Sequence, residues 1–286
     1  MLRTRILTAL VILPIIFTAL FLFPDWAWAI FTLGIAAVAC WEWSRFCQLS
    51  NFARGVYYAL SAVLAGSIFW MYLDRALIHF ETLLLIAFSV SAIFWICVAP
   101  VWLAKNWQPK GNLGRVLAAA TGWIVIIPTW LAFLALRNWS PWMFLTFAVI
   151  VWVADVAAYF VGKGIGKHKL AASISPGKTI EGAVGGLVGV AVYFLLWQVV
   201  AGHAVHRGDD WARELHSHGW ILFGVFVVLG LLSVLGDLFE SWMKRVANMK
   251  DSSGLLPGHG GVLDRIDALT STLPIAGLYL LLMQRL

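Results

Sequence analysis

The sequence predicts an all-α, polytopic integral membrane protein with about nine transmembrane helices and polar loops concentrated on one side of the membrane. Two observations lead to this prediction. Only 12% of the 286 residues are Asp, Glu, Lys or Arg, about half of the usual share in soluble proteins, while 62% are hydrophobic. Apolar runs of about 17–22 residues recur along the chain, and each is long enough to cross a hydrocarbon core of roughly 30 Å.

The apolar runs divide the chain into residues 1–140, with about five spans, and residues 141–286, with about four. The predicted spans cover about residues 6–23, 26–44, 56–73, 77–103, 116–136, 142–161, 182–201, 219–240 and 268–284. The first span follows Arg3 and Arg5 and precedes Ala27-Trp28-Ala29, a pattern that resembles a secretory signal with its cleavage site. Its long apolar stretch and the hydrophobic residues after it favour a retained helix instead.

The positions of Lys and Arg predict the orientation, because cytoplasmic loops are enriched in both. With the N-terminus in the cytoplasm, the inner side receives Arg3, Arg5, Arg45, Arg54, Lys105, Lys110, Arg115, Lys163, Lys167, Lys169, Lys178, Lys244, Arg245, Lys250 and Arg265. The outer side receives Arg75, Arg137, Arg207, Arg213 and Arg285. This bias places the loops 104–115, 162–181 and 241–267 in the cytoplasm. The net charge of +6 is therefore assigned to orientation and to anionic lipid, and no nucleic-acid partner is expected.

Charged residues are concentrated in the segment 241–267 and just before it. Positive charge alone would fit an ordinary cytoplasmic loop, but that interpretation does not explain the carboxylates of Asp237, Asp264 and Asp267. Asp264 and Asp267 are three residues apart and would share one face of a helix. Such carboxylates suit a hard cation, above all Mg²⁺, which proteins hold with one or two carboxylates together with substrate phosphates. The neighbouring cations that match phosphate oxygens are Lys244, Arg245, Lys250 and Arg265.

A second polar group surrounds the loop 162–181. Asp155 precedes this loop within a predicted span, where a carboxylate must face protein, water or a cation. The fragment Gly177-Lys178-Thr179 resembles part of a P-loop, but Ala172 replaces the required glycine and the strand–loop–helix setting is missing. Two interpretations stay open. Ser175 or Thr179 caps the next helix and does nothing more, or Lys178 and the helix N-terminus contact a phosphate.

The run that begins at Ser241 resembles the signature of the phosphatidate cytidylyltransferases, also called CDP-diacylglycerol synthases. It reads Ser241-x-Met-Lys244-Arg245-x4-Lys250-Asp251-x-Ser253-x2-Leu-Pro257-x-His259-Gly260-Gly261-Val-x-Asp264-Arg265-Ile-Asp267. No position departs from the family pattern. The segment 236–241 and the region from Asp155 to Glu181 also resemble this family. The resemblance is therefore specific over about residues 150–270.

The resemblance implies an enzyme that converts CTP and phosphatidate to CDP-diacylglycerol and pyrophosphate with Mg²⁺ as cofactor. It further implies a multi-pass protein of the bacterial inner membrane, with its active-site loops in the cytoplasm, and a homodimer, which nothing in the sequence itself indicates. By resemblance the metal ligands are Asp237, Asp264 and Asp267. The catalytic residues are then Asp264, Asp267, Lys244 and Arg265, and the substrate-binding residues are Asp155, Lys178, Ser241, Arg245, Lys250 and His259. For His259, a role as a turn residue stays equally open.

Three other functions are alternatives to this one. A CTP-using lipid kinase would transfer the γ-phosphoryl group to a lipid alcohol, release CDP and need a base for the hydroxyl. A secondary transporter could couple ions through Asp155 and Asp237, but it would need broken helices near the midplane and repeat symmetry between its halves. The alcohol phosphotransferases that consume CDP-diacylglycerol usually carry an Asp-Gly-x2-Ala-Arg motif, which this sequence lacks.

Overall fold

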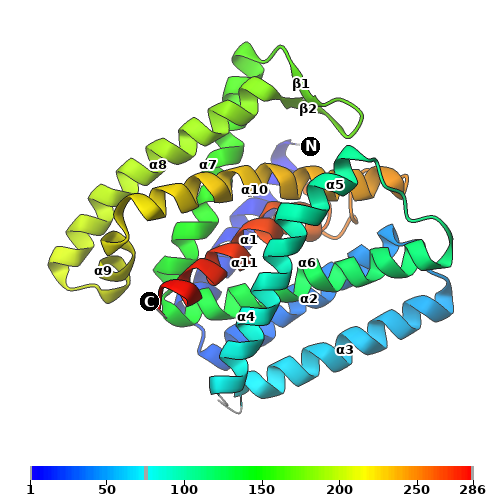
Figure 1. Ribbon diagram of the computed structural model, residues 1–286, viewed down its shortest axis with the longest axis horizontal. Helices are drawn as coiled ribbons and strands as arrows, with labels where there is room; N and C mark the ends of the chain where they lie inside the picture. The colour runs from blue at the N-terminus through cyan, green and yellow to red at the C-terminus, as the bar shows by residue number, and fades with distance from the viewer. Residues whose placement is uncertain (1, 74–76, 285–286) are drawn as a thin grey trace.

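The computed structural model describes residues 2–73 and 77–284, so Arg75 and Arg285, both part of the orientation count, lie outside the described residues. The chain forms a bundle of long helices with one small hairpin at its edge (Figure 1). Its elements are α1 (Leu2–Leu22), α2 (Asp25–Phe46), α3 (Asn51–Leu73), α4 (Leu77–Ile93), a π-helical segment (Phe94–Val98), α5 (Ala99–Ala104), α6 (Gly111–Trp139), α7 (Pro141–Ile165), β1 (Lys169–Ala171), β2 (Ser175–Thr179), α8 (Ile180–Arg207), α9 (Asp210–Ser217), α10 (Gly219–Val246) and α11 (Leu263–Met283).

The predicted all-α membrane architecture is confirmed. Among the residues that the structure describes, eight helical segments are long and apolar enough to cross a bilayer, and Ile6–Leu22 is a shorter apolar helix. The count of nine spans therefore stays a prediction. The predicted span 77–103 consists of α4, the π-helical segment and α5 in continuous succession, so that His79–Ala104 makes a single candidate span.

Several helices continue beyond the predicted spans. The helix α10 runs to Val246, so Ser241, Lys244 and Arg245 lie on its last turns. The prediction that these residues belong to the loop 241–267 is therefore wrong. The helix α11 begins at Leu263, so Asp264 and Asp267 lie in its first turns. Hydropathy reports only the apolar part of a helix, whereas the backbone hydrogen bonds continue into the polar residues at its end.

Two segments that were expected to be loops have regular structure. Within 162–181, β1 and β2 pair antiparallel, with Lys169 opposite Thr179 and Ala171 opposite Ser175. Thr179 then caps α8, since its hydroxyl oxygen accepts a hydrogen bond from the amide of Gly182 at 3.0 Å. The segment 202–218, which connects the predicted spans 182–201 and 219–240, consists of the end of α8 and the short helix α9.

The helices α6 and α11 lie at the centre of the bundle, whereas α3 and α8 lie at its periphery (Figure 1). The outer helix α8 packs closely on α7 because its contact face is made of glycine. An added Cβ at Gly182, Gly185, Gly186 or Gly189 would lie within 3.0 Å of an α7 atom or, at Gly182, also of Thr179. Small residues at such contacts let membrane helices approach closely, and this contact fixes α7 beside the hairpin.

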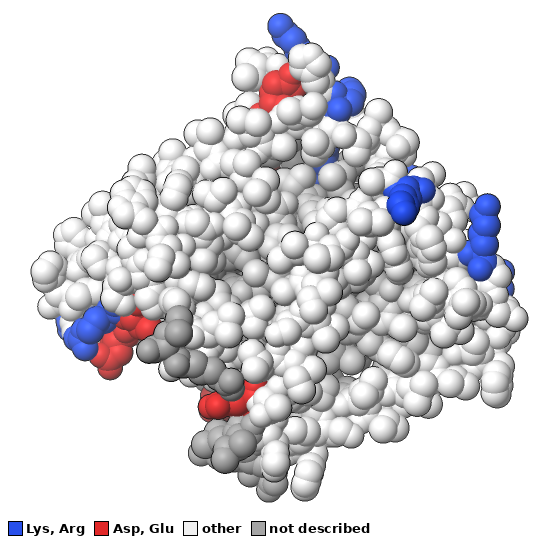
Figure 2. Space-filling model, viewed as in Figure 1, with Lys and Arg blue, Asp and Glu red and all other residues white. Residues whose placement is uncertain are grey.

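Charged side chains occupy the two ends of the bundle. On the face shown in Figure 2, they lie at the upper and right-hand edges, in a mixed group near α9 and in a small acidic group near the lower edge, with an almost uncharged surface between them. We call the end formed by residues 105–110, the hairpin 169–179 and the loop 247–262 the hairpin rim. Trp242 Nε1 donates to Asn106 Oδ1 at 3.2 Å, and Arg245 Nε donates to the Ile174 carbonyl at 3.3 Å. The three loops predicted to share one side of the membrane therefore meet at this rim.

Gly236 allows α10 and α11 to come together just below the hairpin rim. An added Cβ there would lie 2.4 Å from Ser271 Oγ and 2.9 Å from the Asp267 carbonyl oxygen. We expect Gly236→Ala to lower the melting temperature by several degrees, because such overpacking costs about 1–3 kcal/mol. The measurement is a thermal unfolding curve of the purified protein in detergent. Gly224→Ala is the matched control, since Gly224 lies on the same helix with nothing within 4 Å of its Cβ position, and equal melting of the two variants would contradict the prediction.

Candidate active site

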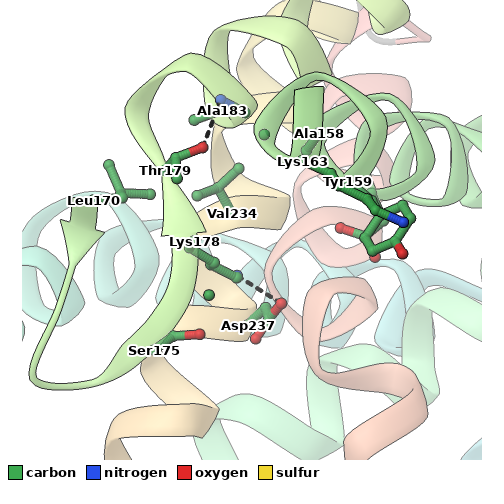
Figure 3. A pocket seen from close by; sticks show the side chains of 14 residues that line it. Ala158, Tyr159, Lys163, Leu170, Ser175, Lys178, Thr179, Ala183, Val234 and Asp237 are labelled. Carbon is green, nitrogen blue, oxygen red and sulfur yellow. Dashed lines mark hydrogen bonds and ion pairs between the residues drawn. The ribbon is translucent and has the colours of Figure 1, made fainter. Parts of the chain in front are cut away.

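A cleft opens at the hairpin rim between α7, the hairpin, α8 and α10 (Figure 3). Its volume is about 450 Å³, within the range of small-molecule sites. The lining consists of Asp155, Ala158, Tyr159, Gly162, Lys163, Leu170, Ser175, Gly177, Lys178, Thr179, Gly182, Ala183, Val234 and Asp237. Polar groups of the rim and apolar groups of the spanning helices therefore line one and the same space.

An ion pair joins the two sides of this cleft. Lys178 extends from β2 toward α10, and its Nζ lies 2.6 Å from Asp237 Oδ2 (Figure 3). The other oxygen of Asp237 accepts a hydrogen bond from the Ser241 hydroxyl, one helical turn later, at 3.3 Å. Both members of the ion pair are about one quarter exposed, so they remain accessible to a ligand in the cleft.

More charged groups surround this pair. Asp155, on α7, interacts electrostatically with Asp237, Lys178 and Arg265. Asp267, on α11, interacts with Asp237 and Lys178 as well, and also with Lys244 of the neighbouring cluster. Five of the predicted site residues, Arg265 included, thus form one cluster, contributed by α7, the hairpin, α10 and α11. In the sequence, spacing linked only Asp264 with Asp267, and the family resemblance added Asp237.

Asp264 belongs to a neighbouring cluster and makes more hydrogen bonds than Asp237 does. Its Oδ1 accepts from Lys244 Nζ at 2.5 Å. Its Oδ2 accepts from the amide and hydroxyl of Ser252, both at 2.9 Å, and from the Gly261 amide at 2.8 Å. Lys244 is largely buried and also pairs with Glu240. Asp264 therefore binds a cation with one oxygen and the loop 247–262 with the other.

Three predicted cations and His259 lie near the hairpin rim. Arg245, Lys250 and Arg265 are exposed, and Arg245 donates to the carbonyls of Ile174 and Met249. His259 lies between Gly258 and Gly260, both with positive φ, and its amide donates to the Leu256 carbonyl at 2.8 Å. Its ring Nδ1 is buried without a hydrogen-bond partner among the described residues. Its backbone thus lies in a turn, and the structure shows no polar contact that assigns its ring a binding role.

The sequence interpretation missed one acidic residue of this region, Glu42. This side chain is fully buried on α2 and accepts hydrogen bonds from three donors of the segment 252–263, while the Ser252 hydroxyl, which donates to Asp264, lies 3.1 Å from its Oε2. The sequence does contain an indication of its role, because an ionisable residue within a predicted membrane span is by default a candidate functional residue. The same rule identified Asp155.

The donor chemistry of the two clusters fits a hard divalent cation. No group of three or more His, Cys, Asp or Glu side chains is arranged as a metal site within residues 2–73 and 77–284. However, Mg²⁺ is usually held by only one or two carboxylates, with the rest of its shell from water and substrate phosphates. Asp237 Oδ2 and Asp264 Oδ1 each bind a lysine ammonium group. A divalent cation can take the place of these ammonium groups, since each lysine has a flexible stem.

The chain is similar to known proteins over most of its length. The model of the cytidylyltransferase family matches residues 3–283. A phosphatidate cytidylyltransferase of Haemophilus influenzae is 34% identical over 96% of both chains, and one of Pseudomonas aeruginosa is 36% identical over 96% of this chain and 95% of the relative. A phosphatidate cytidylyltransferase of Staphylococcus aureus is 41% identical over 46% of each chain.

Proposed function

The chain belongs to the cytidylyltransferase family, and we propose from this membership and from the cleft that it is a phosphatidate cytidylyltransferase. Its reaction would combine CTP with phosphatidate to give CDP-diacylglycerol and pyrophosphate. The observation that carries the proposal is the pair Lys178–Asp237 in the cleft, with Asp155, Asp267 and Arg265 in electrostatic contact around it.

The lining of the cleft suits two substrates of different solubility. Lys178 lies at the hairpin rim and Lys163 lies in the last turn of α7 beside it, where a soluble nucleotide can enter. Ala158, Ala183 and Val234 continue the lining onto helices that are apolar enough to span the membrane. A lipid can therefore bring its phosphate into the cleft while its acyl chains stay in the bilayer.

In the proposed reaction, a phosphate oxygen of phosphatidate attacks the α-phosphorus of CTP. A new P–O bond forms, and the bond from the α-phosphorus to the oxygen that bridges to the β-phosphorus breaks, so that pyrophosphate leaves. The attacking phosphate is already largely ionised near neutral pH, and the step needs no general base. Phosphoryl chemistry of this kind depends mostly on positioning and on stabilisation of charge.

Three carboxylates and two lysines of the two clusters have roles in this proposal. Asp237, Asp264 and Asp267 would hold Mg²⁺, which neutralises phosphate charge when it is bound. Lys178 and Lys244, displaced from their carboxylates, would then bind phosphate oxygens as point charges. The exposed cations of the rim would attract the nucleotide, and these are Arg245, Lys250 and Arg265.

The proposal includes the orientation and the assembly. We infer a cytoplasmic hairpin rim from the excess of Lys and Arg in the segments that form it, and cytoplasmic CTP requires the same orientation. Because the relatives above are bacterial, the membrane would be the bacterial inner membrane. A homodimer belongs to the proposal by family resemblance.

The decisive experiment supplies the purified full chain with phosphatidate, Mg²⁺ and CTP labelled at the α-phosphorus. We expect the label to appear in the lipid, unlabelled pyrophosphate to be released, and EDTA to stop the transfer. Label that is found in CDP, with none in the lipid, would contradict the proposal and favour a lipid kinase. Transfer that continues at full rate in EDTA would contradict the assignment of Mg²⁺.

A further inference from the structure

We propose that Glu42 is a positioning residue for the cytidylyl transfer. It lies on α2, outside the residues that line the cleft, and it fixes the loop 247–262 and the start of α11. Through these segments it places Asp264 and Asp267. This inference rests on the proposed function, because it concerns residues to which that function assigns the metal and the chemistry.

Both carboxylate oxygens of Glu42 bind the segment 252–263. Oε1 accepts from the Ser253 hydroxyl at 2.5 Å and from the Val262 amide at 3.0 Å. Oε2 accepts from the Leu263 amide at 2.7 Å and lies 3.1 Å from the Ser252 hydroxyl. Since Glu42 has no exposed surface, water cannot hydrate its carboxylate, and these donors take the place of that water. Four contacts from one side chain hold both ends of a loop that has almost no regular secondary structure.

Glu42 also caps the helix that carries Asp264 and Asp267. The first amides of a helix have no partner within the helix, and the Val262 and Leu263 amides at the start of α11 donate to Glu42 instead. A carboxylate at this end is further stabilised by the helix dipole. The first turn of α11 is therefore held by a helix more than 200 residues earlier in the chain.

A single side chain connects Glu42 with Asp264. The Ser252 hydroxyl lies 2.9 Å from Asp264 Oδ2 and 3.1 Å from Glu42 Oε2. Arg45, one turn after Glu42, reinforces this connection, because its guanidinium donates to the Ser252 carbonyl at 2.6 Å. A rotation of Asp264 away from this position would break its contacts with the loop as well as its ion pair with Lys244.

Gly261 shows how closely the loop fits around Glu42. A Cβ at this position would lie 2.2 Å from Glu42 Oε1 and 2.0 Å from Ser252 Oγ, far inside normal contact distances. The loop can therefore reach the carboxylate only because residue 261 has no side chain. The contact is specific in shape as well as in charge.

The experiment compares Glu42→Gln with Ser44→Ala in the purified full chain. Ser44 is the matched control, since it is a buried polar residue of the same helix whose hydroxyl contacts Tyr58, away from the loop. We expect Glu42→Gln to accelerate amide hydrogen exchange within residues 252–263 by about tenfold or more without substrate. In the labelled-CTP assay its kcat should fall by about 30-fold or more while the KM for CTP changes less than about threefold.

A double variant tests the connection to Asp264. Glu42→Gln combined with Ser252→Ala should lose no more turnover than the more damaging single substitution, because both break the same link. If Glu42→Gln fails to accumulate, Ser252→Ala and Ser253→Ala each remove one donor, and both are expected to show the faster exchange. Wild-type exchange in the segment, or losses that multiply in the double variant, would overturn the inference. Absence of label transfer in the wild-type protein would instead contradict the proposed function, while the exchange rates would still decide the contacts of Glu42.

Discussion

Asp237→Asn is expected to lower the kcat/KM of cytidylyl transfer by about 10³-fold, in the range that lost preorganised charge contacts reach in other enzymes. The substitution keeps the shape of the side chain but removes the charge that pairs with Lys178 across the cleft. It also removes the negative charge on α10 with which Asp155 and Asp267 interact. A neutral amide is a weak ligand for Mg²⁺, so the Mg²⁺ concentration at half-maximal rate should rise as well. The measurement is a series of initial rates at varied Mg²⁺.

The control for this variant is Asp210→Asn. Asp210 also takes part in an ion pair, with Arg213 at 3.0 Å, but the pair lies on α9 and is exposed. An exposed pair contributes about 0–1 kcal/mol, and we expect wild-type rates and an unchanged Mg²⁺ requirement. A kcat/KM of Asp237→Asn within about threefold of this control would exclude Asp237 from the cation site.

The fold class could be predicted from the sequence because a bilayer imposes a simple condition. A segment that crosses it must be apolar over a fixed length, and the chain meets that condition repeatedly. The ends of the helices could not be predicted in the same way. The last turns of α10 and the first turns of α11 are polar, so hydropathy assigned them to a loop, although they are helical. The β1–β2 hairpin is too short to show the alternation of a strand.

The site was predictable in its composition more than in its arrangement. The residues Asp155, Lys178 and Asp237 were identified by their chemistry and their position at the ends of spans, and the structure brings them together. The division into two clusters was not predictable, because it depends on which carboxylate Lys178 and Lys244 reach. Glu42 was missed for a related reason. Its partners lie more than 200 residues away, and no local spacing connects it with them.

Asp264→Asn is the substitution that best tests the division of work within the second cluster. An amide can still accept a hydrogen bond from the loop through its carbonyl oxygen, so residues 252–263 should keep most of their order. It cannot hold a cation in place of Lys244, whose ammonium lies 2.5 Å from Asp264 Oδ1. We expect kcat to fall by about 10³-fold, with a protein that still purifies as a folded species from membranes.

Glu240→Gln provides the comparison, because it removes the other carboxylate that pairs with Lys244 and leaves Asp264 charged. If Asp264 serves the reaction by binding the divalent cation, Glu240→Gln should lose less than about tenfold in kcat, since Lys244 keeps one partner. If Asp264 serves only to fix Lys244, the two variants should fall by similar factors. Equal losses, with an unchanged Mg²⁺ requirement in Asp264→Asn, would therefore remove Asp264 from the metal ligands and leave it as the anchor of the loop. A higher Mg²⁺ requirement in Asp264→Asn alone would establish that one carboxylate serves both the cation and the loop.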